Sequence, residues 1–510
     1  MKLRLFVCSI IIGWQFHLYG QIGDLPRATP ESMGIPSEKI TEYFDSLMRF
    51  PNTEIHSVVV MRHGRVVAEL HPQPFMPQYG HTLFSCSKTF AAAAIGIAIS
   101  ENLLNLSDRL ISFFPEYLPY PVPAQLQRIT IEDLLTMRSG FVVDTRMRTI
   151  SQQWVKDYLN HPMNAEPGTR FAYDSIDTYL LSAILQRKTG KTLLEYLKEH
   201  IFNDLHIKEV KWEYSPEGIT TGGWGLYLQP ESMAKFGQLL LQKGKWRGRQ
   251  LIPADWVDLM MRKHVTNNQG DDYCFQMWRC GKHNAARADG AYGQYIYVLP
   301  GKDMVVTVTQ CMISGNAAQH EILWSMVVPY VKDGMLEEDT HDLKKLRKFE
   351  STCSHPLPEG KKRHNNLDSL LNRKIVLAKN PLEWNSLQLT QDEEAQIHLI
   401  VTDDKKRSGD ILLGFKEWRT SPIGFYPLYV RTATQNRFSS FYPPFQAGAA
   451  YAWEDGVLKI KIHFADWLTS VELRLKYSDG GVSVTAHENY QASAINLRAT
   501  LNGETTNKLK

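Results

Sequence analysis

The sequence predicts an α/β protein in two parts. The first part is a sandwich in which an antiparallel sheet is flanked by helices and carries a helical subdomain, and the second is a C-terminal antiparallel β domain. Strand patterns, a helix-rich middle, returning strands and a closing helix follow one another along the first two thirds of the chain, unlike the repeating strand–helix series of a parallel sheet. The last third consists of alternating strands and tight turns. With 43% hydrophobic and 22% charged residues, the 510-residue chain has the composition of ordinary globular domains, which excludes a disordered or collagen-like protein.

Residues 1–20 are expected to be a signal peptide. Lys2 and Arg4 precede a mostly apolar run of about ten residues, and Gly20 offers a small residue for cleavage. The run is shorter than the ~20 residues that span a bilayer. A lipoprotein is less favoured because Cys8 lies inside the apolar run. We therefore expect cleavage near Gly20–Gln21, no transmembrane segment in the mature chain, and a periplasmic or secreted protein.

The six cysteines do not form the pattern of a disulfide framework. Cys274 and Cys280 lie in YCFQMWRC, which alternates like one strand, and six residues along a strand span about 20 Å. That separation is beyond disulfide reach. We expect mostly free, buried thiols.

The first domain is expected to span residues 21–335. Two β-branched runs flank a His63-Gly64 turn within residues 57–70, which predicts a hairpin. Residues 87–100 are apolar nearly all round, as in a buried helix. The further helices are expected at 131–137, 151–159, 176–186, 192–201, 230–242 and 317–331, and the returning strands at 273–280, 293–300 and 304–309.

A charged, proline-containing segment at residues 336–366 is typical of a linker between domains. Residues 367–510 are then expected to form the β-rich domain. Its strands are predicted at 397–404, 410–418, 451–464 and 471–488, with hairpin turns at 454–456 and 478–481.

Ser85-Cys86-Ser87-Lys88 is the motif that carries the candidate chemistry. Residues i and i+3 share one face of a helix, so the Ser85 hydroxyl and the Lys88 amine can meet. Apolar surroundings lower the pKa of a lysine towards that of a general base, which a serine nucleophile requires. The Ser85 N–H, at a helix N-terminus, can face an oxyanion. The alternative, Ser85 as a helix cap with a solvated Lys88, is disfavoured by the apolar run that follows.

With this motif the chain resembles the serine β-lactamase and penicillin-binding-protein superfamily, particularly its class C-like esterases and amide hydrolases. The resemblance runs in order through residues 104–116, 129–140, 166–175, 222–244 and 289–309, and covers about residues 28–335. It implies a β-lactamase/transpeptidase-like fold, with Ser85 as nucleophile and Lys88 as its base.

The second family signature, Tyr-x-Asn, reads Tyr173-Asp174-Ser175 here. The resemblance implies that Tyr173 shares the proton of Ser85 and passes it to the leaving group. Ser175 replaces the asparagine and cannot reproduce the reach of a carboxamide, which weakens the case for β-lactam recognition. This variant is similar to 6-aminohexanoate-dimer hydrolases and some esterases.

The third signature, normally Lys-Thr-Gly or His-x-Gly, corresponds to Ala291, Tyr292 and Gly293. No cation in this stretch can bind the carboxylate of a penicillin, although its backbone can supply an oxyanion N–H. The literal Lys-Thr-Gly at residues 188–190 is expected to end a helix, with Gly190 as C-cap. Glu166 is expected in a surface turn rather than as a deacylating base.

These residues predict an exported serine hydrolase that cleaves an ester or linear amide bond through an acyl-enzyme on Ser85. Lys88 and Tyr173 would relay the proton, while Ser175 and residues 291–293 would contact the substrate or the oxyanion. Two alternatives stay open. One is a D-amino-acid or cell-wall peptidase or a β-lactamase, and the other is a non-catalytic, penicillin-binding-like sensor.

No cofactor or metal is expected. The partial zinc motif at His320 has Trp324 in place of its second ligand, and no complete phosphate loop occurs. A net charge of +3 gives no electrostatic reason for nucleic-acid binding. The expected partner is a small ester or amide, and the oligomeric state stays open.

Overall fold

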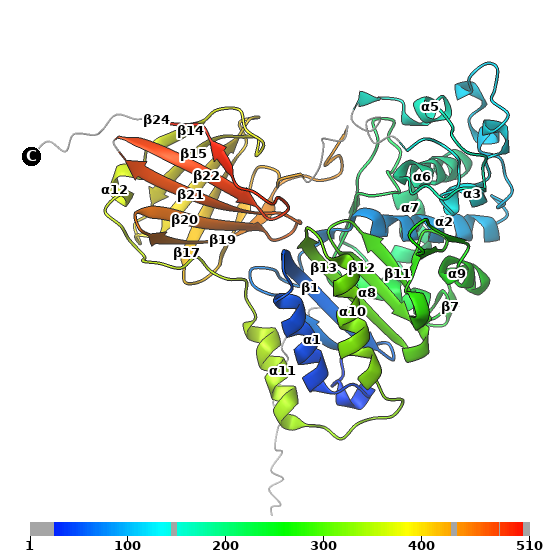
Figure 1. The fold of residues 1–510 in the computed structure, drawn as a ribbon, viewed down its shortest axis with the longest axis horizontal. Coiled ribbons are helices and arrows are strands. Elements are labelled where there is room, and N and C mark those ends of the chain that lie inside the picture. Colours follow the sequence, from blue (N-terminus) through cyan, green and yellow to red (C-terminus); the bar gives the residue numbers. More distant parts are fainter. Residues whose placement is uncertain (1–24, 144–149, 430–435, 479, 503–510) are drawn as a thin grey trace, which may run out of the picture.

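The computed structural model describes residues 25–143, 150–429, 436–478 and 480–502, which build two large β-sheets in separate lobes (Figure 1). The expected signal peptide and its cleavage site lie outside the described residues. Within the described ranges, no helix has both the length and the apolar character needed to cross a membrane.

The sheet of the N-terminal domain (residues 25–335) has eight strands, all antiparallel, in the order β2-β1-β13-β12-β11-β10-β9-β8. The predicted hairpin is confirmed, and its turn residues His63 and Gly64 have φ of 49° and 71°, as a tight two-residue turn requires. The strands are β1 (Thr53–Arg62), β2 (Arg65–Leu70), β8 (Val265–Thr266), β9 (Asp272–Tyr273), β10 (Trp278–Arg279), β11 (Ala286–Gly290), β12 (Gln294–Leu299) and β13 (Met304–Met312).

Helices cover both faces of this sheet. Alternate residues of β1 enter different cores: Val58 and Val60 join the core under α1 (Ser37–Met48) and α10 (Asn316–Met326), whereas Val59 and Met61 join the core that contains α2 (Ser87–Ser100) and α8 (Pro230–Leu241). Because both faces are covered, the central strands β1, β12 and β13 are buried along most or all of their length. The predicted sandwich is confirmed.

The helical subdomain surrounds α2, which is buried on all sides as predicted. Among the other helices, α3 (Ile131–Leu135), α5 (Trp154–Leu159) and α10 are shorter than expected by two or more residues. The first ends early because Met137 takes a φ of 57°, and Pro329 ends the closing helix by removing a backbone donor. The other helices of this domain are α6 (Ser175–Thr189), α7 (Leu193–Leu197) and α9 (Ala254–Met261). Helix α7 continues as a π-helical turn.

The prediction of a single strand over residues 273–280 is wrong. Tyr273 in β9 pairs with Trp278 in β10, because the chain reverses at Gln276, which has a φ of 61°. The Gln276 amide stabilises the reversal by donating to the carbonyls of Leu134 and Leu135 at 3.1 and 2.9 Å. The expected separation of about 20 Å between Cys274 and Cys280 along one strand is therefore wrong. All cysteines that the structure describes are nevertheless free thiols, and most of them are buried.

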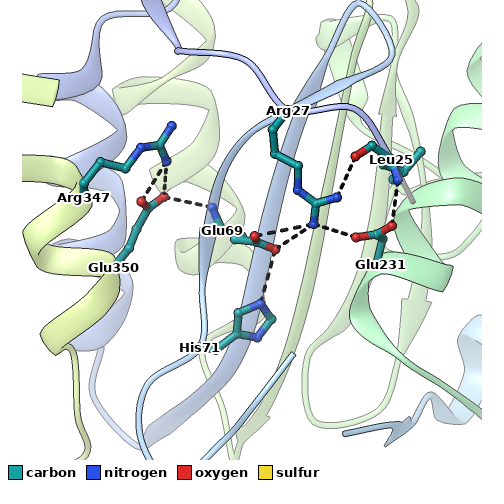
Figure 2. Close-up of polar contacts among 7 residues, drawn as sticks. All are labelled: Leu25, Arg27, Glu69, His71, Glu231, Arg347 and Glu350. Carbon is teal, nitrogen blue, oxygen red and sulfur yellow. Dashed lines mark hydrogen bonds and ion pairs between the residues drawn. The ribbon is translucent and has the colours of Figure 1, made fainter. Parts of the chain in front are cut away.

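Residues 336–366, expected as a linker, contain helix α11 (Thr340–Thr352), which packs against α1. Glu350 on α11 accepts a hydrogen bond from the backbone N–H of Glu69 on β2 at 3.0 Å. The Glu69 side chain faces Arg27, whose guanidinium pairs with Glu231 on α8 at 2.6 Å (Figure 2). This network ties the start of the chain, β2, α8 and α11 together, so the helix is fixed to the N-terminal domain.

The second sheet has eleven strands and nearly closes into the C-terminal barrel (residues 367–502). Its closure comes from two consecutive segments: β23 (Ile495–Leu497) pairs with one end of the sheet and β24 (Ala499–Asn502) with the other. The other strands are β14 (Lys374–Leu377), β15 (Trp384–Gln391), β16 (Ile397–Asp403), β17 (Ser408–Phe415), β18 (Arg419–Ile423), β19 (Phe445–Glu454), β20 (Val457–Phe464), β21 (Ser470–Ser478) and β22 (Gly481–Glu488).

The barrel contacts the N-terminal domain at several places. Glu54 on β1 accepts hydrogen bonds from Ser470 and Asn489, each at 2.8 Å, and pairs with Lys461 at 3.3 Å. Tyr429 and Phe438, which lie between β18 and β19, also contact Glu213 of the N-terminal domain.

Candidate active site

Ser85 lies in the short 3₁₀ turn Phe84–Cys86 that leads into α2. The turn is held by Ser87, whose hydroxyl donates to the carbonyl of Phe84 at 2.6 Å. Cys86 makes the first backbone bond of the turn, to Leu83 at 3.1 Å. The Ser85 N–H lies one residue before the N–H that makes this bond, so it can point at another acceptor.

Lys88 contacts the predicted nucleophile. Its Nζ is 2.9 Å from Ser85 Oγ, 3.0 Å from Ser175 Oγ and 2.6 Å from the carbonyl oxygen of Gly223. The i, i+3 spacing on α2 brings Ser85 and Lys88 together, and the start of α6 adds Ser175. Lys88 is only 1% exposed, so its charged form is poorly solvated.

The three contacts of Lys88 suit a general base. A carbonyl oxygen can only accept, so Gly223 fixes one N–H of the amine, and the Ser175 hydroxyl can accept a second. In the neutral amine the lone pair is then left for the hydroxyl proton of Ser85. The neutral Lys88 amine is therefore placed to take the proton of Ser85.

Tyr173 lies beside this pair. Lys88 Nζ is 4.9 Å from the centre of its ring, and the ring stacks on Trp278 with centroids 5.8 Å apart. The next residue, Asp174, caps α6 by accepting from the Ile176 N–H at 3.0 Å. The second motif is thus rigidly placed next to the first.

The third motif, residues 291–293, forms the turn between β11 and β12. Gly293 has a φ of 90°, and a Cβ on it would lie 2.1 Å from the Gln310 side chain, so only glycine fits. Ala291 lines the same cavity as Ser85 and Tyr173. All three motifs therefore meet at one site.

That cavity has a volume of about 700 Å³, a size suited to a small organic molecule. Its lining includes five charged residues: Asp271, Arg279, Arg287, Asp289 and Glu321. The sequence analysis missed Arg287 and Asp289, whose side chains pair at 2.9 Å. Counting back in steps of two from Ala291 would have found them, since alternate residues of a strand share a face. A cation is thus present near the third motif, but a carboxylate neutralises it.

His320 and Trp324, the remnants of the zinc motif, also line this cavity. His320 Nδ1 lies 2.6 Å from the Tyr297 hydroxyl, and burial lowers the pKa of His320 to about 3, which keeps it neutral. His283 stacks on Trp324 with centroids 4.3 Å apart. In the part of the chain that the structure describes, no group of three or more His, Cys, Asp or Glu could hold a metal ion.

The two misleading motifs lie elsewhere. Gly190 caps the end of α6 in the left-handed conformation, and its N–H bonds to the carbonyl of Gln186, as expected. Glu166 is exposed and pairs with Arg128 on the surface. Neither Gly190 nor Glu166 is among the described residues that line the cavity around Ser85.

Comparison with known proteins shows the family to which the chain belongs. The sequence profile of the Beta-lactamase family matches residues 44–316, more than half of the chain. The 6-aminohexanoate-dimer hydrolase of Paenarthrobacter ureafaciens is 21% identical over 328 residues, which cover 58% of this chain and 83% of that protein. A beta-lactamase of Yersinia enterocolitica is 24% identical over 189 residues, 35% of this chain and 42% of its own.

Among solved structures, a Bacillus anthracis protein described as a candidate 6-aminohexanoate-dimer hydrolase superposes with a TM-score of 0.51 at 21% identity. The superposition covers 60% of this chain and 86% of that one. It supports the β-lactamase/transpeptidase-like fold predicted for the N-terminal domain. The chain belongs to the beta-lactamase family of serine hydrolases.

Proposed function

We propose that the protein hydrolyses an ester or linear amide bond through an acyl-enzyme on Ser85. The observation that carries this proposal is the 2.9 Å contact between Lys88 Nζ and Ser85 Oγ, because it places a buried amine in position to activate a serine that borders the cavity.

The reaction begins when Ser85 Oγ attacks the substrate carbonyl carbon and Lys88 takes the hydroxyl proton. The carbonyl oxygen becomes an oxyanion that accepts hydrogen bonds from the N–H groups of Ser85 and Ala291. The bond to the leaving group then breaks, and Lys88 and Tyr173 return the proton to the leaving oxygen or nitrogen. Water attacks the acyl-enzyme by the same relay and releases the acid and free Ser85.

Several features favour esters and linear amides over β-lactams. Residues 291–293 carry no cation, and Asp289 neutralises the nearby Arg287. Ser175 is in contact with Lys88, so its hydroxyl serves the base rather than reaching for a substrate amide. The Paenarthrobacter ureafaciens relative is named for the hydrolysis of a 6-aminohexanoate dimer.

The test is a panel of a p-nitrophenyl ester, a linear amide and nitrocefin, assayed with the wild type and Ser85→Ala. We expect turnover of the ester and the amide, and a loss of at least about a thousandfold in Ser85→Ala, since the nucleophile cannot be replaced. Full activity in Ser85→Ala would refute the proposal. Preference for nitrocefin or D-amino-acid peptides would favour the β-lactamase or peptidase alternative, and labelling of Ser85 without turnover would favour a sensor.

We also propose that residues 1–20 direct export of the protein. The basic Lys2 and Arg4 before a short apolar run support this proposal. The mass of the protein recovered from the expressing cell's exterior or periplasm should correspond to a chain that begins near Gln21. Recovery of the uncleaved chain from the cytoplasm alone would contradict it.

A further inference from the structure

The C-terminal barrel packs against the residues next to the proposed oxyanion donors. Phe84 precedes Ser85, and Tyr292 follows Ala291. The rings of Phe84 and Tyr292 meet edge to face with centroids 5.5 Å apart, and both pack against the hydrophobic core of the barrel. Phe84 also lines a small cavity together with Tyr429 of the barrel.

Both aromatic residues have a backbone conformation that needs support from their surroundings. Phe84 has a φ of 46° and Tyr292 a φ of 63°. This region is unfavourable for residues with a Cβ, and it persists where packing over-determines it. The barrel supplies part of that packing, so it helps to hold the two turns that present the oxyanion donors.

A second contact between the domains involves Glu213, which follows β4 (Val210–Trp212). Its carboxylate is 2% exposed and accepts hydrogen bonds from the Tyr429 hydroxyl at 2.9 Å and from the Phe438 N–H at 3.0 Å. Burial raises the pKa of Glu213 to about 7, while the donors from Phe438 and Tyr429 act in the opposite direction. Both donors belong to the segment between β18 and β19, so the barrel stabilises this buried carboxylate.

The Glu213 backbone leads from this contact to the general base. Its N–H donates to the carbonyl of Gly225 at 3.1 Å, and its carbonyl accepts from Thr221 at 2.9 Å. Gly223 lies between those two residues and offers its carbonyl oxygen to Lys88 at 2.6 Å. The Glu213 backbone thus holds both sides of the loop that carries the Lys88 acceptor.

We propose that the C-terminal barrel is an activating element of the hydrolase, which positions the oxyanion turns through Phe84 and Tyr292 and the Lys88 acceptor through the Glu213–Tyr429 contact. This inference rests on the proposed function. Glu213 and Tyr429 are positioning residues, since neither is among the described residues that line the cavity around Ser85. A barrel that served only as a separate binding module would leave the chemistry independent of this contact.

The test compares two tyrosine variants of the full chain. Tyr429→Phe removes the hydroxyl that bonds to Glu213, whereas Tyr426→Phe removes one that donates to the Phe441 carbonyl within the barrel, at the same 2.9 Å. Steady-state rates on a p-nitrophenyl ester are divided by the number of Ser85 sites titrated with a fluorophosphonate. We expect kcat per site to fall at least about tenfold in Tyr429→Phe with KM within about twofold, and to be unchanged in Tyr426→Phe.

Equal kcat per site in the two variants, or a rise in KM alone, would overturn the inference, because a merely structural contact lowers the number of active sites and not the rate of each. Glu213→Gln keeps the size of the side chain and one acceptor oxygen, and it should also lower kcat per site. If Tyr429→Phe does not fold, kcat per site of Glu213→Gln decides the question. A wild type without Ser85-dependent turnover would refute the proposed function instead.

Discussion

Lys88 is the side chain on which the chemistry depends most. Its amine is buried and contacts Ser85 Oγ, Ser175 Oγ and the carbonyl oxygen of Gly223, and the proposed reaction requires Ser85 to give up its proton. A buried ammonium is costly, and the Lys88 amine contacts hydroxyl and carbonyl oxygens of Ser85, Ser175 and Gly223. These conditions suit a base that is neutral before the reaction and charged during it.

Replacement of this amine should separate catalysis from folding. We expect Lys88→Met, which keeps the length of the side chain, to lower kcat on the ester by at least about a hundredfold, the usual contribution of a general base. The free energy of unfolding should change by less than about 2 kcal/mol, because an apolar chain replaces a buried polar one. Ester assays and urea titrations measure the two effects, and retained turnover would exclude Lys88 as the base.

At this scale the sequence was sufficient for part of the site. Ser85 and Lys88 follow from helical spacing, and Tyr173 and Ser175 from a second motif in the expected order. Gly223 could not be found this way, because it contributes only a backbone carbonyl from a distant loop. Arg287 was accessible through strand periodicity but lies outside any motif.

Among the structural elements, the turn between β11 and β12 is the most constrained part of the site. Tyr292 and Gly293 both have positive φ, and the Tyr292 carbonyl accepts from the Met312 N–H at 3.0 Å. The turn is therefore tied to β13 while it presents Ala291 to the cavity.

We predict that Gly293→Ala destabilises the protein by about 2 kcal/mol or more and reduces turnover. A left-handed conformation costs a residue with a Cβ about 1–2 kcal/mol, and the added carbon would meet Gln310 at 2.1 Å. Gly301 in the next turn is a matched control, since a Cβ there meets nothing within 4 Å and its φ is not in that range. Urea unfolding of both variants checks the difference, and equal stability would contradict the strain at Gly293.

Elements were predictable where a single local pattern determined them. The hairpin of β1 and β2 and the helix α2 follow from β-branched runs around a turn and from a long apolar run. The segment 273–280 was not predictable, because alternation along the chain does not reveal the reversal at Gln276. That reversal depends on two carbonyl acceptors in α3, those of Leu134 and Leu135.

At the scale of the whole molecule, the two domains meet at a cluster of buried histidines: His56, His81, His355 and His463. His56 Nδ1 is 2.8 Å from His81 Nε2, and the ring centroids of His355 and His463 are 5.0 Å apart. Burial lowers the pKa of each, to about 4 for His81. Glu54 and Lys461 are the charged groups that act on this cluster.

This cluster makes stability depend on pH. The folded histidines are neutral, whereas in the unfolded chain their pKa is ~6.5, so below that value the unfolded state binds more protons. The free energy of unfolding should therefore be highest above about pH 6.5 and fall by several kcal/mol as the pH drops towards 4. Urea titrations near pH 7.5 and near pH 5 measure the loss, and equal values would contradict it.

His463→Phe isolates one member of the cluster. Its ring lies among aromatic neighbours, with Phe75 and Trp418 at centroid distances of 5.4 and 4.9 Å, so a phenylalanine should be accommodated. The variant should lose less stability on acidification than the wild type.

Peptide mapping after inactivation with a fluorophosphonate tests whether Ser85 forms the acyl-enzyme. We expect one phosphonyl group per chain, on the peptide that contains Ser85, and loss of ester turnover in proportion to labelling. Label on another residue, or full turnover by the labelled protein, would contradict it.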